Sequence, residues 1–140
     1  MYATASDSVY LYWLNKSITG LKNRTKCNIF ALNTIYKAGY QCPDVYLLTH
    51  DLFDKEKYND VFPFIEILSP NEISKGDLVI WDGHVIISES IVLLKETYYS
   101  FGIWGGSKRE NDGENIINNV AYGKYKLEGN YIVRRPQKRN

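Results

Sequence analysis

Cys27 and His84 are the two residues of this sequence best suited to chemistry near neutral pH. Cys27 lies in the run Thr25-Lys-Cys-Asn-Ile-Phe30 at the start of a predicted helix, and His84 begins a predicted strand. Unpaired N–H groups and the dipole at a helix start favour a thiolate, and the adjacent Lys26 adds positive potential. A thiolate that meets an imidazole in the fold can attack an amide carbonyl. On residue chemistry alone, a small buried helix cysteine is the commoner interpretation of Cys27.

The motifs around both residues resemble those of a known enzyme family. Lys26-Cys-Asn-Ile-Phe30 resembles the nucleophile helix of the NlpC/P60 and CHAP peptidoglycan hydrolases, which are papain-like cysteine peptidases and amidases. Gly76-Asp-Leu-Val79 followed by His84-Val-Ile-Ile87 looks like the same family's strand pair, and Tyr131–Pro136 is similar to its closing strand. The order of the motifs agrees with the family, and the resemblance spans residues 23–136. The first motif and the closing strand look closest to small bacterial amidase effectors.

The resemblance implies a catalytic role for several residues. Cys27 would be the nucleophile that forms an acyl-enzyme, with its backbone N–H helping to form the oxyanion hole. His84 would be the general base and then the general acid. A polar residue on the next strand usually orients the imidazole: alignment favours Ser100, Glu96 is the chemically better rival, and a dyad without a third side chain is a further option. No metal or organic cofactor is expected, because thiolate, imidazole and backbone donors suffice for acyl transfer.

Two further residues offer alternatives to this assignment. His50, on a predicted helix, is a rival base, although a surface or groove-lining role is the simpler interpretation. Cys42 could form a disulfide with Cys27, which would silence the nucleophile; a free, partly buried thiol is the simpler interpretation. Two cysteines and two histidines make neither a disulfide scaffold nor a good zinc site.

Length and composition exclude several classes of protein. The 140 residues indicate one domain over 1–140, with a polar tail at 136–140. Lys and Arg total 17 and Asp and Glu total 16, which argues against attachment to nucleic acid or anionic lipid by bulk charge. No apolar run approaches the roughly 18 residues of a membrane helix, so no membrane anchor is expected. Met1–Asp7 lacks the basic and apolar regions of a signal peptide, so the export route is not visible.

The elements that must position these residues follow an α+β pattern, with helices in the first half and strands in the second. Helices are expected near Tyr10–Ile18, capped by Ser6 or Asp7, then over Lys26–Ala38, capped by Thr25, and over Asp44–Phe53. Strands are expected over Phe64–Leu68, Asp77–Trp81, His84–Ser88, Ile91–Leu94, Thr97–Phe101, around Ile116–Tyr122 and over Tyr131–Arg135, with a tight turn at Asp82–Gly83 and a loop over Gly102–Gly113. The resemblance implies a papain-like NlpC/P60 fold, with N-terminal helices packed on an antiparallel sheet of five or six strands.

Aromatic and charged side chains could recognise a substrate. Trp81, Tyr99 and Trp104 could line a groove for a glycan or peptide, although aromatic residues on strands are more often part of a core. The charged segment Ser107–Glu114 could recognise a charged stem peptide, with a solvated loop as the simpler interpretation. The basic C-terminal end, from Arg134 on, could touch anionic cell wall but is expected to be a solvated tail.

The sequence therefore predicts a cysteine amidase or endopeptidase that acts on peptidoglycan stem peptides in the cell wall, in the periplasm or outside the cell. Members of the family cut either the γ-D-glutamyl bond to the diamino acid or the bond between sugar and peptide. A papain-like protease or acyltransferase with another substrate, and a non-catalytic cell-wall-binding relative, are the alternatives. The setting could be that of a lysin, a remodelling enzyme or a toxin, and a toxin would need an inhibitory immunity protein as its partner.

Overall fold

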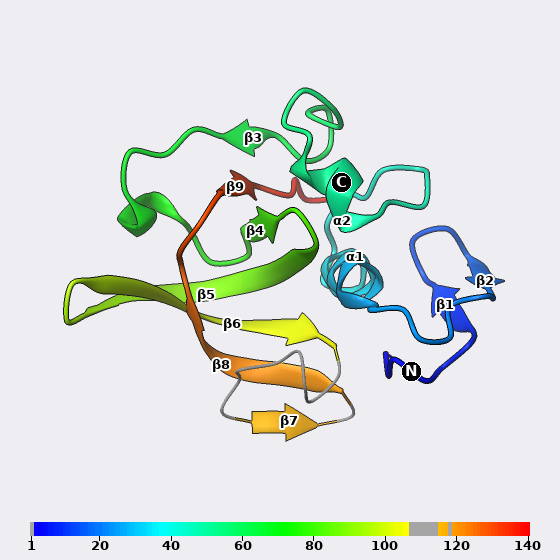
Figure 1. Ribbon diagram of the computed structural model, residues 1–140. Coiled ribbons are helices and arrows are strands. Elements are labelled where there is room, and N and C mark those ends of the chain that lie inside the picture. The colour runs from blue at the N-terminus through cyan, green and yellow to red at the C-terminus, as the bar shows by residue number, and fades with distance from the viewer. Residues whose placement is uncertain (1, 107–114, 118) are drawn as a thin grey trace.

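The computed structural model describes residues 2–106, 115–117 and 119–140, and it has an α+β architecture (Figure 1). This confirms the predicted fold class. The elements, in chain order, are β1 (Val9–Leu11), β2 (Lys16–Ile18), α1 (Cys27–Lys37), α2 (Thr49–Phe53), β3 (Phe64–Ile65), the 3-10 turn η1 (Pro70–Glu72), β4 (Leu78–Trp81), β5 (His84–Leu94), β6 (Thr97–Gly105), β7 (Asn115–Ile117), β8 (Val120–Lys126) and β9 (Tyr131–Arg134).

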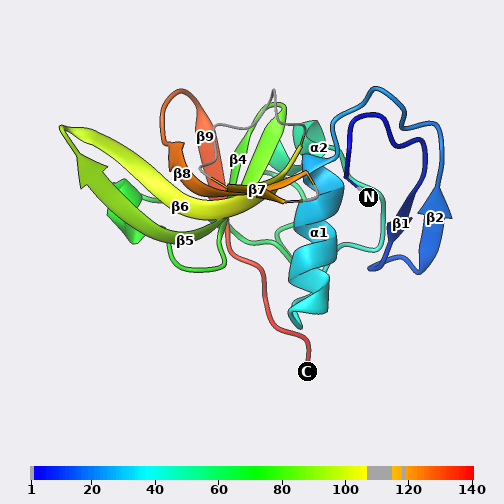
Figure 2. The same cartoon turned by 90° about the horizontal axis from the view of Figure 1, so that it is seen from below.

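An antiparallel sheet with the strand order β3-β9-β4-β5-β6-β8-β7 forms most of the described structure. It has seven strands, where five or six were expected, because the short edge strands β3 and β7 are both part of it. Asp82 and Gly83 form the predicted tight turn between β4 and β5, with Trp81 opposite His84. The longer hairpin of β5 and β6 extends away from α1 (Figure 2).

Each face of the sheet packs into its own hydrophobic cluster. Leu78, Ile80 and Val85 lie in the cluster that contains the buried residues of α1. Their strand neighbours Val79 and Ile86 lie in the cluster on the other face, which contains Trp104 and Ala121 as well. This alternation follows from the two-residue period of a strand. We call the two faces the helix face and the aromatic face.

Helix α1 agrees with its prediction to within one residue at each end. Cys27, Ala31 and Ile35 are buried, as their spacing along one helix face indicates. The residue at the N-cap position is Lys26 rather than Thr25, and no side chain caps the helix there. The predicted cap is wrong because Lys26 is turned inward and leads the chain into the helix from a buried position.

The helix predicted near Tyr10–Ile18 is wrong, because this segment is the β1–β2 hairpin. Asn33 of α1 explains the difference. Its side-chain oxygen accepts a hydrogen bond from the Tyr12 N–H at 2.8 Å, and its Nδ2 donates to the Tyr10 carbonyl at 2.9 Å. Asn15, with φ of 53°, adopts the left-handed conformation in the connecting turn. The hairpin thus depends on a tertiary contact that apolar spacing does not reveal.

The helix predicted over Asp44–Phe53 begins only at Thr49. The Leu47 carbonyl accepts a hydrogen bond of 2.7 Å from the Asn28 side chain of α1. That carbonyl is therefore bonded to another element instead of to a helix ladder of its own. The loop predicted over Gly102–Gly113 begins later, because β6 continues to Gly105. The part of that loop from residue 107 on, and with it the charged segment Ser107–Glu114, lies outside the described residues.

The basic C-terminal end is only in part the predicted solvated tail: residues 137–140 are exposed, whereas Arg134 is buried, which corrects the prediction there. Arg134 is fully buried in β9 and donates to four carbonyls, those of Leu52, Asp54, Lys57 and Phe62. Arg139 donates to the carbonyl oxygens of Tyr36 and Tyr40 at 2.7 and 2.9 Å, where α1 ends. Carbonyl dipoles near a helix end stabilise a cation. Arg134 therefore connects β9 to the chain around the end of α2, and Arg139 connects the C-terminal residues to the end of α1.

Candidate active site

The structure brings Cys27 and the beginning of the His84 strand to the same end of the sheet. Cys27 is the first residue of α1 and is 2% exposed. Its Sγ lies 4.0 Å from the carbonyl oxygen of Gly83, the residue that precedes His84. The thiol therefore lies against the β4–β5 turn. The first N–H groups of α1 have no helical acceptor, and the positive end of the helix dipole lies here, so the position favours a thiolate.

Three aromatic rings surround the imidazole of His84. Its centroid lies 5.1 Å from that of Tyr125, with the two rings stacked at 26°. The Trp81 ring is 6.3 Å away and the Trp104 ring 6.5 Å away. Sequence reasoning did not single out Tyr125, although its place in an alternating strand beside other aromatic residues was a usable signal. These contacts hold the ring on the aromatic face, while Cys27 belongs to the cluster on the helix face.

The buried Lys26 stabilises the loop that leads into α1. Its Nζ donates to the carbonyl oxygens of Leu21 and Arg24, both at 2.9 Å, and to that of Thr4 at 3.3 Å. A buried ammonium group needs such acceptors, because desolvation of an ion is otherwise unfavourable. The Lys26 side chain, predicted to add positive potential beside Cys27, thus directs these hydrogen bonds into the loop that precedes the helix.

The two residues predicted to orient the imidazole do not lie beside it. Ser100 is paired with Ile91, far along β5 from His84, and its hydroxyl lies 2.8 Å from that of Ser88. Glu96 lies in the turn between β5 and β6, with φ of 67°, at the opposite end of the strand from His84. The strands predicted separately over His84–Ser88 and Ile91–Leu94 form the single strand β5, and the hairpin turn follows Leu94.

The three aromatic residues predicted to bind substrate differ in their burial and in their distance from His84. Trp104 is fully buried in the cluster on the aromatic face, so its role is in packing rather than in binding. Trp81 is partly exposed, and its indole N–H donates to the Glu128 carbonyl at 2.8 Å. Tyr99 lies opposite Val92, farther along the β5–β6 hairpin. Of the three, Trp81 alone is both partly exposed and in contact with the His84 ring.

His50, the alternative base, and Cys42, the second thiol, both lie on other segments than the β4–β5 turn that Cys27 contacts. His50 is exposed on α2, as its predicted helix position indicates. Within the described residues, no disulfide joins Cys42 to Cys27. Cys42 is partly buried, its Sγ lies 3.5 Å from the Leu32 carbonyl, and burial raises the pKa of its thiol to about 12. Cys42 is therefore a protonated thiol near neutral pH.

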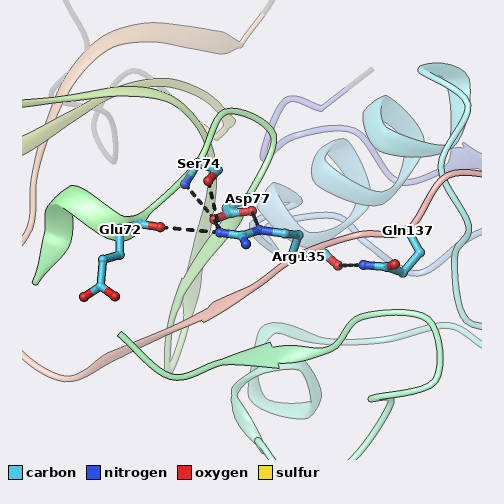
Figure 3. Close-up of polar contacts among 5 residues, drawn as sticks. All are labelled: Glu72, Ser74, Asp77, Arg135 and Gln137. Carbon is cyan, nitrogen blue, oxygen red and sulfur yellow. Dashed lines mark hydrogen bonds and ion pairs between the residues drawn. The ribbon is translucent and has the colours of Figure 1, made fainter. Parts of the chain in front are cut away.

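Asp77 of the Gly-Asp-Leu-Val motif has a structural contact with the C-terminal strand (Figure 3). Its carboxylate is 1% exposed and accepts two hydrogen bonds of 2.9 Å from the Arg135 guanidinium and one of 2.8 Å from the Ser74 N–H. The hydrogen bond to Asp77 raises the pKa of Arg135. This bidentate pair joins the segment before β4 to the end of β9, because guanidinium and carboxylate match in geometry.

Comparison with protein-family models, curated proteins and solved structures gives no significant match for this chain. Among the residues that the structure describes, no cluster of three His, Cys, Asp or Glu side chains is arranged to hold a metal ion. Across those residues, no helix has the length and apolar character needed to cross a membrane.

Proposed function

We propose that this protein hydrolyses amide bonds of peptidoglycan stem peptides through a Cys27 thiolate, as a peptidase or amidase of the NlpC/P60 type. The observation that carries the proposal is the position of Cys27, at the first residue of α1 and 4.0 Å from the turn that leads into the His84 strand. A helix start favours the thiolate, and a strand that begins with His84 next to it supplies the base.

The chemistry would proceed by acyl transfer. The Cys27 thiol gives its proton to His84, and the sulfur attacks the amide carbonyl carbon to form a C–S bond. The negative oxygen that develops accepts a hydrogen bond from the Cys27 N–H. The C–N bond then breaks, and the amine leaves with the proton from His84. Water, deprotonated by His84, releases the acyl group as a carboxylic acid and restores the thiol.

The proton transfer requires the imidazole on the Cys27 side of the β4–β5 turn. His84 is the first residue of β5 and directly follows Gly83, whose carbonyl oxygen lies 4.0 Å from Cys27 Sγ, so the two residues meet at the same turn. The stacked Tyr125 ring would then hold the imidazole in its resting position. In the toxin setting of this proposal, an inhibitory immunity protein would be the partner of the enzyme in the producing cell.

Mass spectrometry of peptidoglycan fragments tests the proposal. Purified peptidoglycan is incubated with the wild-type chain, with Cys27→Ala and with the matched control Cys42→Ala. We expect new fragments from the wild type and from Cys42→Ala but none from Cys27→Ala, and the fragment masses identify the bond cut. Fragments from Cys27→Ala, or none from the wild type, would contradict a Cys27-dependent peptidoglycan hydrolase.

A further inference from the structure

The hairpin of β5 and β6 has one open strand edge. Strand β4 pairs only with the first four residues of β5. Ser88, the next residue in that ladder, donates to the Asp77 carbonyl at 2.9 Å and accepts from the Gly76 N–H at 2.8 Å. Beyond Ser88, no described segment pairs with β5 on the side of β4, whereas β6 is paired on the other side as far as the hairpin turn. The open edge therefore comprises residues 90–94, in the hairpin that extends away from α1 (Figure 2).

The backbone groups of this edge point outward at two positions. In an antiparallel ladder, the residues of one cross-strand pair exchange hydrogen bonds, and those of the next pair direct their groups away from each other. Leu93 is paired with Tyr98, whose carbonyl oxygen accepts from the Leu127 N–H at 2.9 Å, on the far side of β6 from β5. The backbone groups of Leu93 therefore point away from β6, and so do those of Ile91, two residues earlier. Such a row of outward N–H and C=O groups can accept a further strand.

The side chains along the edge are apolar at its centre and charged at its two ends. Leu93 is 53% and Leu94 41% exposed, and Val92 is partly exposed. Residues 90–94 carry no charge, but the exposed residues Glu89 and Lys95 flank them. An apolar edge strand that solvent reaches is a template for pairing with another chain.

We propose that a second copy of this chain occupies the edge, so that the two β5 strands pair antiparallel about a two-fold axis at Val92. The extent of the edge sets this register, because residues 90–94 paired with their own copies in the opposite direction centre on residue 92. Ile91 then lies opposite Leu93 of the second copy, so the outward backbone groups of both residues meet. The contact uses the same patch on both copies, as a two-fold dimer requires.

Charge complementarity favours a second copy over a partner of another sequence. In this register Glu89 lies opposite Lys95 of the second copy, and the two-fold axis repeats the pair at the other end. A register with the axis one residue away, at 91 or 93, would place Glu89 opposite Leu93 or Thr97 instead. Five paired residues on each copy make a small interface, so we expect a dissociation constant in the micromolar range.

Sedimentation velocity of the full chain between about 5 and 500 μM tests the proposal. We expect the sedimentation coefficient to rise with concentration toward that of a dimer. Leu93→Pro removes an outward N–H, and proline is tolerated at such an edge position, so this variant should be folded and monomeric. Its urea midpoint checks the fold. A wild type that stays monomeric over this range, or a dimer that persists in Leu93→Pro, would overturn the proposal.

Charge reversal tests the register. At low ionic strength, Glu89→Lys and Lys95→Glu should each weaken the dimer about tenfold, because two like-charged pairs replace two ion pairs. The double variant restores opposite charges and should recover the wild-type dissociation constant. Lys22→Glu, the same change of charge in the exposed loop before α1, is the matched control and should have no effect. A double variant that pairs no more tightly than the single variants would overturn antiparallel pairing about Val92.

Discussion

The two ends of the layer formed by α1 and the β4–β5 hairpin hold their polar groups in different ways. At the Cys27 end, the thiol is 4.0 Å from a carbonyl oxygen, and the His84 ring stacks on Tyr125. At the Asp77 end, a buried carboxylate accepts three hydrogen bonds of 2.8 to 2.9 Å. Short, paired hydrogen bonds fix one geometry, whereas ring stacking and a long sulfur contact permit rearrangement.

The contrast indicates that the two ends of the segment Gly76–His84 have different roles, one in stability and one in activity. Gly76 to His84 spans both ends of the hairpin. Its Asp77 forms a contact that joins the segment before β4 to the end of β9, and its His84 begins β5 directly after the turn that Cys27 Sγ approaches. Substitutions at the Asp77 end should therefore lower stability, and those at the Cys27 end should lower activity. Hydrolysis rates, thiol reactivity and unfolding free energies each test this separation.

The largest expected effect is that of His84→Gln on hydrolysis. Loss of the proposed general base should lower the rate by about a thousandfold. Glutamine loses the ring stacking on Tyr125, so the urea midpoint should fall slightly, while the loss of activity should be far larger. Steady-state hydrolysis of a stem peptide and urea denaturation measure the two quantities. The matched control is His50→Gln, on the exposed surface of α2, which should keep full activity. If His50→Gln lowered the hydrolysis rate and His84→Gln did not, His50 rather than His84 would be the base.

The second prediction compares the two thiols. Cys27 should react with iodoacetamide at least about a hundredfold faster than Cys42 at pH 7, because a helix start favours the thiolate whereas burial raises the pKa of Cys42 to about 12. Cys27 is the less exposed of the two, so access to solvent cannot produce this order.

Site-resolved mass spectrometry across pH 6 to 9 measures both rates. The Cys42 rate should rise about tenfold per pH unit throughout, because its pKa lies above that range. The Cys27 rate should level off. In urea the two rates should become similar, which serves as the control. Parallel rises at both cysteines in the folded protein would rule out an activated thiol at α1.

The elements that the sequence predicted well are those with strong local signals. The spacing of Cys27, Ala31 and Ile35 defined the buried face of α1, and Asp82–Gly83 defined the turn between two apolar strands. The closing strand β9 was predicted to within one residue at its end. In each case local propensity and burial favour the same structure, so the element can be predicted from a single sequence.

The predictions that failed depend on contacts between distant segments. The N-terminal hairpin is held by Asn33, and the register that separates Ser100 from His84 is set by the length of β5. The inward position of Lys26 depends on carbonyls of the preceding loop. Buried polar groups of this kind are satisfied in three dimensions, and neither apolar period nor residue spacing encodes their partners.

The smallest expected effect is at the Asp77 end and concerns stability alone. Arg135→Met should lower the free energy of unfolding by about 2 kcal/mol, because it leaves the Asp77 carboxylate buried without its cation. Asp77→Asn should lower it by about 1 kcal/mol, since the Arg135 side chain is 39% exposed and can be hydrated instead. Urea denaturation of both variants and of the double variant measures the effects and their coupling.

The difference in unfolding free energy between Arg135→Met and Asp77→Asn shows which partner depends more on the ion pair. If the Asp77 carboxylate is fixed mainly by Arg135, the double variant should be no less stable than Arg135→Met, because no uncompensated buried charge remains. Stem-peptide hydrolysis per folded molecule should be unchanged in all three variants, since the pair lies at the end of β4 away from Cys27. A loss of activity without a loss of stability would show that the Asp77 end takes part in the chemistry, and the separation between the two ends would then be wrong.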